Sequence, residues 1–168
     1  MLIYHPAFDI YNCVFRMLQL LSYMKQEEVE VDKLRIWDFY LTFPNEARNI
    51  SYPSNLSELK KIFRKKDPNP YEDLIDAKRI VERMKSYQLS ALKCIASYGF
   101  IDSELLGKNI VRRTNKELPT ELSNKLNELS IEKQNVIKLV VSFWDFPLYG
   151  KYGLKYRTGL IEFKYDQR

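Results

Sequence analysis

Two segments near the start of the sequence are apolar around almost their whole circumference, and this feature constrains the fold most. Residues 7–24 predict a helix that begins just after Pro6, because proline suits the first helical position. Residues 32–43 predict a second helix, with Asp32 as its cap and Pro44 at its end. A helix that is apolar on more than one stripe is buried on more than one side. We therefore expect both helices to lie in the interior.

The rest of the chain also reads mainly as helix. Apolar residues at helical spacing predict five further helices, at 56–65, 71–85, 88–98, 121–129 and 131–146. Residues 109–114 alternate and predict a short strand, so 71–114 follow the order helix, turn, helix, extended piece, which resembles a winged-helix unit in outline. Residues 149–166 contain three glycines and an alternating run, which predicts a β-hairpin or a lone terminal strand.

The expected fold is therefore mainly α, a helical bundle with a winged-helix-like segment and a small β element near the C-terminus. The length of 168 residues suits a single domain. We divide this domain into N-terminal apolar helices at 1–53, a basic helical, winged-helix-like segment at 54–116, and C-terminal helices with the β element at 117–168.

The inventory of reactive residues argues against an enzyme. His5 is the only histidine and the two cysteines, Cys13 and Cys94, stand far apart, so no zinc-ligand spacing exists. A phosphate-binding loop needs a glycine five residues before Gly107 or Gly150, and both positions hold aspartate. We predict no catalytic residue, no cofactor and no metal. We expect free, buried thiols. For His5 we expect a capping or core hydrogen bond with Asp9, and the alternative is a bond donated to a neighbouring subunit, with the charge of His5 sensing pH.

The apolar runs are short and interrupted by polar residues, so the sequence predicts no membrane span. The first residues also lack the basic region and cleavage site of a secretory signal. We expect a cytoplasmic protein with no membrane contact.

Positive charge is concentrated in the middle of the chain, where residues 54–116 carry 14 basic and 8 acidic side chains. A basic winged-helix-like segment could contact DNA phosphates. The candidate phosphate contacts are Lys60, Lys61, Arg64, Lys65, Lys66, Arg112 and Arg113. The alternative is a solvated helix face and a solubilised strand edge. The expected recognition helix, 88–98, carries Lys93 as its only charge, which argues against sequence-specific base reading.

The chain is rich in aromatic residues, with 12 tyrosines, 9 phenylalanines and 2 tryptophans. These rings either pack on one another inside the chain or form a permanent partner surface, because aromatic residues are enriched at interface cores. Both explanations stay open here. The candidate partner residues are Phe8, Tyr11, Trp37, Tyr40, Trp144, Tyr149, Tyr152 and Tyr156.

Three segments carry a family resemblance. They are the run Tyr-His-Pro-Ala-Phe-Asp-Ile-Tyr-Asn-Cys-Val-Phe-Arg at 4–16, the run Leu-Arg-Ile-Trp-Asp-Phe-Tyr-Leu-Thr-Phe-Pro at 34–44, and Thr-Gly-Leu-Ile-Glu-Phe at 158–163. In this order they resemble the small middle components of bacterial ABC-three-component conflict systems, a group that includes Lamassu-type anti-phage systems.

The resemblance implies a cytoplasmic, non-catalytic adaptor subunit. Such a subunit would act with an SMC-like ABC ATPase and an effector, often a nuclease, and would couple one to the other, with DNA contact inside the complex left open. The alternative function is a stand-alone winged-helix regulator that binds DNA.

Overall fold

The computed structural model describes residues 4–25, 27–64 and 76–162 of the chain. Its helices are α1 (Ile10–Ser22), α2 (Val31–Thr42), α3 (Ser57–Arg64), α4 (Ala77–Ser97), α5 (Ser103–Leu106), α6 (Thr120–Leu126), α7 (Ile131–Phe143) and α8 (Leu154–Thr158). Three short 3-10 helices, η1 (Pro6–Phe8), η2 (Pro44–Asn49) and η3 (Ser54–Leu56), and two strands, β1 (Glu28–Glu30) and β2 (Ile110–Arg112), complete the described elements. The prediction of a mainly helical protein is confirmed.

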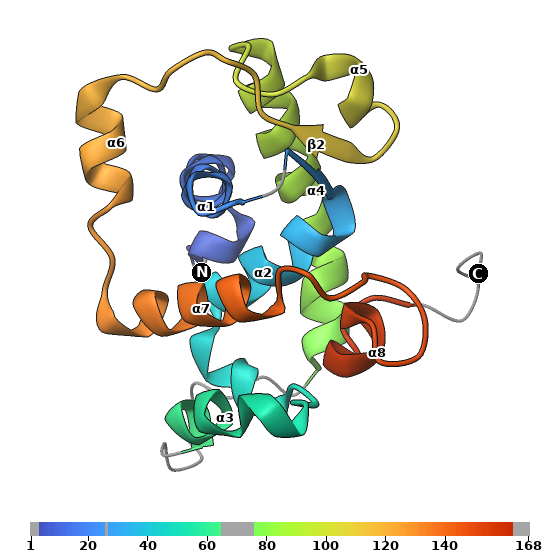
Figure 1. The fold of residues 1–168 in the computed structure, drawn as a ribbon. Coiled ribbons are helices and arrows are strands. Elements are labelled where there is room, and N and C mark those ends of the chain that lie inside the picture. The colour runs from blue at the N-terminus through green and yellow to red at the C-terminus, as the bar shows by residue number, and fades with distance from the viewer. Residues whose placement is uncertain (1–3, 26, 65–75, 163–168) are drawn as a thin grey trace.

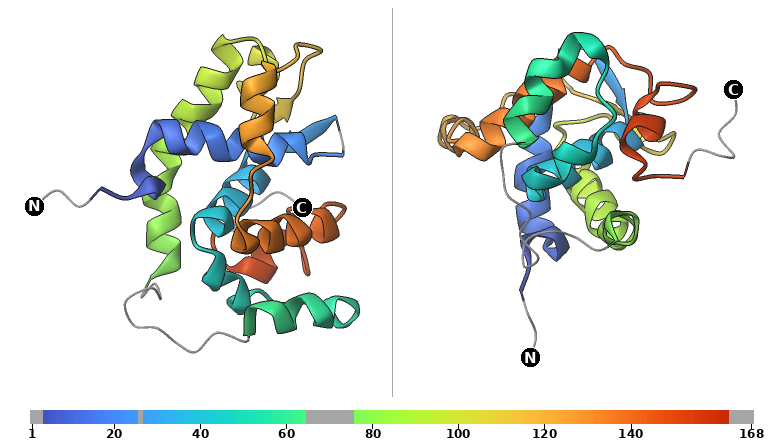
Figure 2. Two further views of the ribbon diagram at one scale, coloured as in Figure 1. Left: turned by 90° about the vertical axis from the view of Figure 1, so that its left-hand side faces the viewer. Right: turned by 90° about the horizontal axis from the view of Figure 1, so that it is seen from below.

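Helix α2 lies at the centre of the molecule and packs against α1, α4 and α7 (Figure 1). Ten of its twelve residues are buried, which confirms that an all-round apolar helix is interior. The long helix α4 runs along the molecule, with β2 beside its upper part in Figure 1, and the left view of Figure 2 shows it at nearly full length. The core therefore forms where the N-terminal helices meet α4 and α7.

The helix–turn–helix expected within 71–98 is wrong. Residues 77–97 form one continuous helix, α4, while 71–75 lie outside the described residues. No glycine or proline interrupts the chain between 85 and 88, and the polar Gln88 is buried rather than placed in a turn. The helix ends at Ser97, two residues before Gly99, whose φ of +81° is unfavourable for other residues. Without the turn, α4 offers no separate recognition helix.

The small sheet also lies elsewhere than predicted. Strands β1 and β2 pair antiparallel, with Val29 opposite Val111, so the strand expected at 109–114 is confirmed but its partner precedes α2. The hairpin or strand expected at 149–166 is wrong where it is described, because residues 154–158 form α8. Leu154 is fully buried there, so the first turn of α8 is anchored in the core. The rest of the alternating run, 163–166, lies outside the described residues.

Two smaller expectations concern thiols and membranes. Cys13 and Cys94 are free, as predicted, but only Cys13 is buried and Cys94 is partly exposed. Within the part of the chain that the structure describes, no helix is both long enough and apolar enough to cross a bilayer.

Candidate partner-binding surface

Three of the candidate partner residues come together in residues 149–157, a segment that we name the aromatic turn. Tyr149, Tyr152 and Tyr156 are 43%, 54% and 47% exposed. The rings of Tyr152 and Tyr156 meet edge to face with their centroids 6.1 Å apart. The aromatic turn thus presents a cluster of half-exposed rings.

The backbone of this turn is unusual at two adjacent positions. Tyr152 has a φ of +76°, a left-handed conformation that costs a bulky residue about 1–3 kcal/mol. Gly153 has no room for a side chain, because a Cβ there would lie 2.3 Å from the carbonyl oxygen of Tyr149. A tyrosine keeps such a conformation only where the surrounding contacts hold it there.

Arg157 fixes the turn to the body of the molecule. Its Nε donates to the carbonyl of Tyr152 at 2.7 Å, and its Nη1 donates to the carbonyl of Ser51 at 2.9 Å. The amide of Ser51 donates back to the carbonyl of Arg157 at 2.8 Å. These bonds fix the backbone of the turn, and a segment that is already ordered loses less conformational freedom in any association.

Lys155 ties the same turn to α2 from inside. It is only 4% exposed, and its Nζ lies 3.3 Å from Asp32 Oδ2 and 4.9 Å from the ring centroid of Tyr149. Sequence reasoning missed Lys155 and Arg157 as positioning residues. The available signal was the alternation of basic and aromatic residues from Lys151 onwards, which is typical of cation–π pairs.

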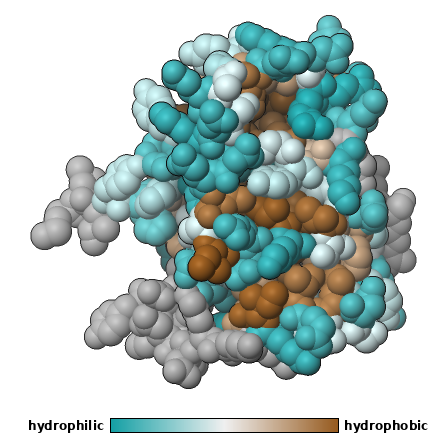
Figure 3. Space-filling view, turned by 60° about the vertical axis from the view of Figure 1, so that its left-hand side comes forward, coloured by the Kyte–Doolittle hydropathy of each residue, from teal (hydrophilic) through white to brown (hydrophobic). Residues whose placement is uncertain are grey.

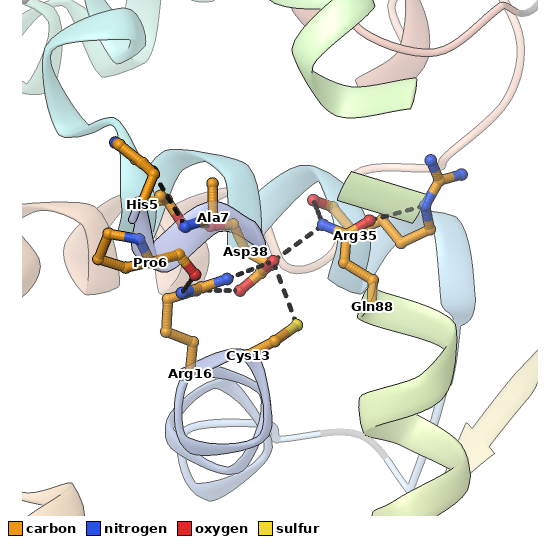
Figure 4. A network of polar contacts seen from close by, with 9 residues as sticks. His5, Pro6, Ala7, Cys13, Arg16, Arg35, Asp38 and Gln88 are labelled. Atoms are coloured by element: carbon orange, nitrogen blue, oxygen red, sulfur yellow. Dashed lines mark hydrogen bonds and ion pairs between the residues drawn. The ribbon is translucent and has the colours of Figure 1, made fainter. Parts of the chain in front are cut away.

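A buried polar network lies beneath these contacts and joins three helices (Figure 4). On α1, Arg16 Nε donates to Asp38 Oδ1 of α2 at 2.6 Å. On α4, Gln88 Nε2 donates to Asp38 Oδ2 at 2.9 Å, and Gln88 Oε1 accepts from Arg35 Nε at 2.9 Å. Arg35 also donates to Asp32, at 3.0 Å. The network therefore runs from α1 to the ion pair that holds the aromatic turn.

Cys13 borders this network but offers no reactive thiol. Its Sγ lies 3.8 Å from Asp38 Oδ2. Burial, followed by the charge of Asp38, raises the pKa of the Cys13 thiol well above its usual range. Because the thiolate is the nucleophile, Cys13 is inert at neutral pH, and the network serves to position helices.

Three other candidate partner residues are not on the surface at all. Trp37, Tyr40 and Trp144 are at most 2% exposed. The prediction that they form part of a partner surface is therefore corrected. They fill the core where α2 meets α7 and the segment after it, and the rings of Trp37 and Phe143 lie 5.9 Å apart. Packing between segments of the chain explains these rings.

The remaining N-terminal candidates are divided between core and surface. Phe8 is half-buried beneath Arg83, whose guanidinium carbon lies 4.4 Å from the ring centroid. Tyr11 projects from α1 and is 87% exposed. His5 caps η1, with Nδ1 accepting from the amide of Ala7 at 3.1 Å, so its structural bond is not made with Asp9.

The structure does not gather the candidate phosphate contacts into one site. On α3, Lys60 is half-buried, and Lys61 pairs with Glu58 at 2.8 Å. At the far end of the molecule, Arg112 pairs with Glu28, and Arg113 donates to the carbonyl of Met24 at 3.0 Å (Figure 1). The remaining candidates are Lys65 and Lys66, which lie outside the described residues, and Arg64, whose side chain also does.

An apolar area that the sequence did not predict lies over α7 and α3. Hydrophobic residues gather there in the middle and lower parts of the face seen in Figure 3. The exposed apolar residues of these two helices are Ile62, Ile131 and Val141. Apolar residues on a predicted helix are assigned to its inner face, so the sequence held no signal for this area.

Comparison with known proteins gives one match. A model of the family described as "ABC-three component (ABC-3C) system Middle Component 5" matches residues 2–166. No curated protein and no solved structure matches the chain.

Among the described residues, no group of three or more His, Cys, Asp or Glu side chains is arranged to hold a metal ion.

Proposed function

Because the chain belongs to the family of ABC-three component system middle component 5, we propose that it is a non-catalytic adaptor that contacts a partner protein through the aromatic turn. The observation that carries this proposal is the rigid presentation of three half-exposed tyrosines by Arg157 and Lys155. Tyrosine buries much area with few rotatable bonds, and it is enriched among the residues that dominate binding energy.

The partners in this proposal are an SMC-like ABC ATPase and an effector, in our view a nuclease. The adaptor would couple the state of the ATPase to the effector inside a bacterial anti-phage complex of the Lamassu type. Two things support these finer assignments: the family membership and the resemblance carried by residues 4–16, 34–44 and 158–163.

The basic side chains of the aromatic turn favour a protein partner over nucleic acid, because most of them already have partners within the chain. Two of the three cations in the aromatic turn are engaged internally, Lys155 with Asp32 and Arg157 with backbone carbonyls. Lys151, which is exposed, lies 5.2 Å from the ring centroid of Tyr152. Binding to a nucleic-acid backbone depends on several available basic side chains, which this turn does not offer.

The test is a binding experiment with the other two components of the system. We expect the double variant Tyr152→Ser/Tyr156→Ser to bind one of them at least tenfold more weakly, because truncating a central aromatic residue typically costs about 2 kcal/mol or more. The matched control is Tyr98→Ser, which removes a tyrosine that is 64% exposed at the end of α4. Equal binding by the wild type and the double variant would contradict the proposal.

Direct DNA contact through α3 remains a separate prediction. The variant Lys60→Glu/Lys61→Glu should weaken binding of the assembled complex to duplex DNA, and it should flatten the dependence of that binding on salt. If the affinity and the salt slope are unchanged, α3 faces solvent instead. Among the described residues, the continuous α4 counts against a stand-alone regulator, because it takes the place of the expected helix–turn–helix.

A further inference from the structure

Residues 117–129 pass around α1 as a segment that we name the strap. It contains α6 and the chain on either side of that helix (Figure 1). The residues just before and after the strap are fixed to the body of the molecule. Before it, the amide of Thr114 donates to the carbonyl of Phe100 at 2.9 Å. After it, Ser130 caps α7 by accepting from the amide of Lys133 at 3.2 Å.

Between these fixed ends the strap packs only lightly on the rest of the protein. All of it lies within the described residues, and among them Leu126 alone is buried. A groove of about 890 Å³ lies between α1 and the chain leading into α6, so the strap does not lie flush on α1. The partly buried apolar residues of the strap are Leu118, Leu122 and Leu129.

The polar contacts of the strap are also few. Within the described residues, two hydrogen bonds join it to the rest of the protein. Gln134 Nε2 of α7 donates to the carbonyl of Leu129 at 3.0 Å, close to the end of the strap. Gln19 Nε2 of α1 donates to the carbonyl of Leu126 at 3.3 Å. The contact between α1 and α6 therefore depends on Leu126 and on one long hydrogen bond.

Gln19 makes this contact weaker still. Its side chain is fully buried, and its Oε1 has no hydrogen-bond partner among the described residues. A buried polar atom without a partner has lost its bonds to water and gained nothing in exchange. Moving Leu126 away from α1 would let water reach this oxygen, so the unpaired atom favours separation of the two helices.

We propose that the strap opens away from α1 while α1, α2, α4 and α7 stay folded. Segments with few buried apolar contacts and an exposed backbone open at a lower free energy than the core of the same protein. Opening uncovers the face of α1 that carries Leu18, Gln19 and Leu21, so the strap controls access to that face. This inference concerns the chain by itself and does not depend on the proposed adaptor function.

The experiment is hydrogen–deuterium exchange of the full chain, read by mass spectrometry. A helix as short as α6, with seven residues, is not stable by itself in water. Once the strap leaves α1, the amides of α6 therefore lose their helical bonds and exchange. We expect them to exchange about a hundredfold faster than the amides of the central helix α2, or more. Protection of α6 equal to that of α2 would overturn the inference.

A core variant separates local opening from unfolding of the whole chain. Leu154 is fully buried in α8, which lies across the molecule from α6 (Figure 1). The cavity left by Leu154→Ala lowers global stability, so α2 should exchange about tenfold faster or more. Exchange in α6 should not change, because opening of the strap leaves residue 154 in place. If α6 accelerates as much as α2, the strap opens only when the whole chain unfolds, and the inference fails.

A second measurement needs no variant and applies even if Leu154→Ala does not fold. Low concentrations of urea speed exchange in proportion to the surface that an opening exposes. Exchange in α2 should therefore rise steeply with urea, and exchange in α6 only slightly. Equal slopes for the two helices would contradict a separate opening of the strap.

Discussion

At the scale of single residues, Asp38 has the most demanding position in the molecule. It is fully buried and accepts hydrogen bonds from Arg16 on α1 and Gln88 on α4. A buried ion pair is a weak source of net stability, but removing one partner leaves an uncompensated charge in the interior. Asp38 therefore adds little net stability to the folded state, but replacing it should be strongly destabilising.

We predict that Asp38→Asn lowers the free energy of unfolding by about 3–5 kcal/mol, because it leaves Arg16 buried without its counter-charge. Urea denaturation followed by circular dichroism measures this change. Glu58→Gln, which breaks the exposed pair with Lys61, is the control and should leave the midpoint nearly unchanged. The double variant Arg16→Met/Asp38→Leu should recover most of the loss, and if it is as unstable as Asp38→Asn, the buried charge is not the cause.

His5 predicts a dependence on pH. Burial, and then the positive charge of Arg16, lower the pKa of His5 below its usual 6.5, and its Nδ1 must stay unprotonated to accept from Ala7. The stability that neutral His5 contributes is therefore present above pH 6.5 and is lost as the pH falls from 6.5 toward the lower pKa of the folded state.

The test compares unfolding free energies at pH 7.5 and pH 5.5 for the wild type and for His5→Asn, whose amide oxygen can still cap η1. The wild type should lose more stability on acidification than the variant. Since His5 is the only histidine, its imidazole proton signal reports the pKa directly by NMR. A value at or above 6.5 would contradict the prediction.

At the scale of elements, local signals predicted some helix ends and missed others. Pro44 follows the end of α2, and Ser130 caps α7 by accepting from the amide of Lys133, as expected. The predicted starts of the first two helices are wrong, because Pro6 begins the separate helix η1, α1 starts at Ile10 after its cap Asp9, and Asp32 lies inside α2. The interruption predicted near residue 87 had no such signal behind it. Gln88, where the second of the two predicted helices was to begin, lies inside α4 and bonds with Arg35 and Asp38 in the core. Tertiary contacts of this kind cannot be read from local sequence.

Continuity of α4 can be tested with a proline. We predict that Ser86→Pro lowers the free energy of unfolding by about 3 kcal/mol or more, because it removes a helical hydrogen bond and clashes with the preceding turn. Ser86 is exposed, so Ser86→Ala should change stability by only a few tenths of a kcal/mol. Thermal unfolding of the two variants measures the difference. Full tolerance of proline would mean that the chain turns at this point after all.

At the scale of the whole molecule, the candidate surfaces were only partly predictable. Tyr149, Tyr152 and Tyr156 were expected from their residue type, but the same reasoning also selected Trp37 and Trp144, which are core residues. Residue type does not decide burial, because that depends on which distant segment packs on the ring.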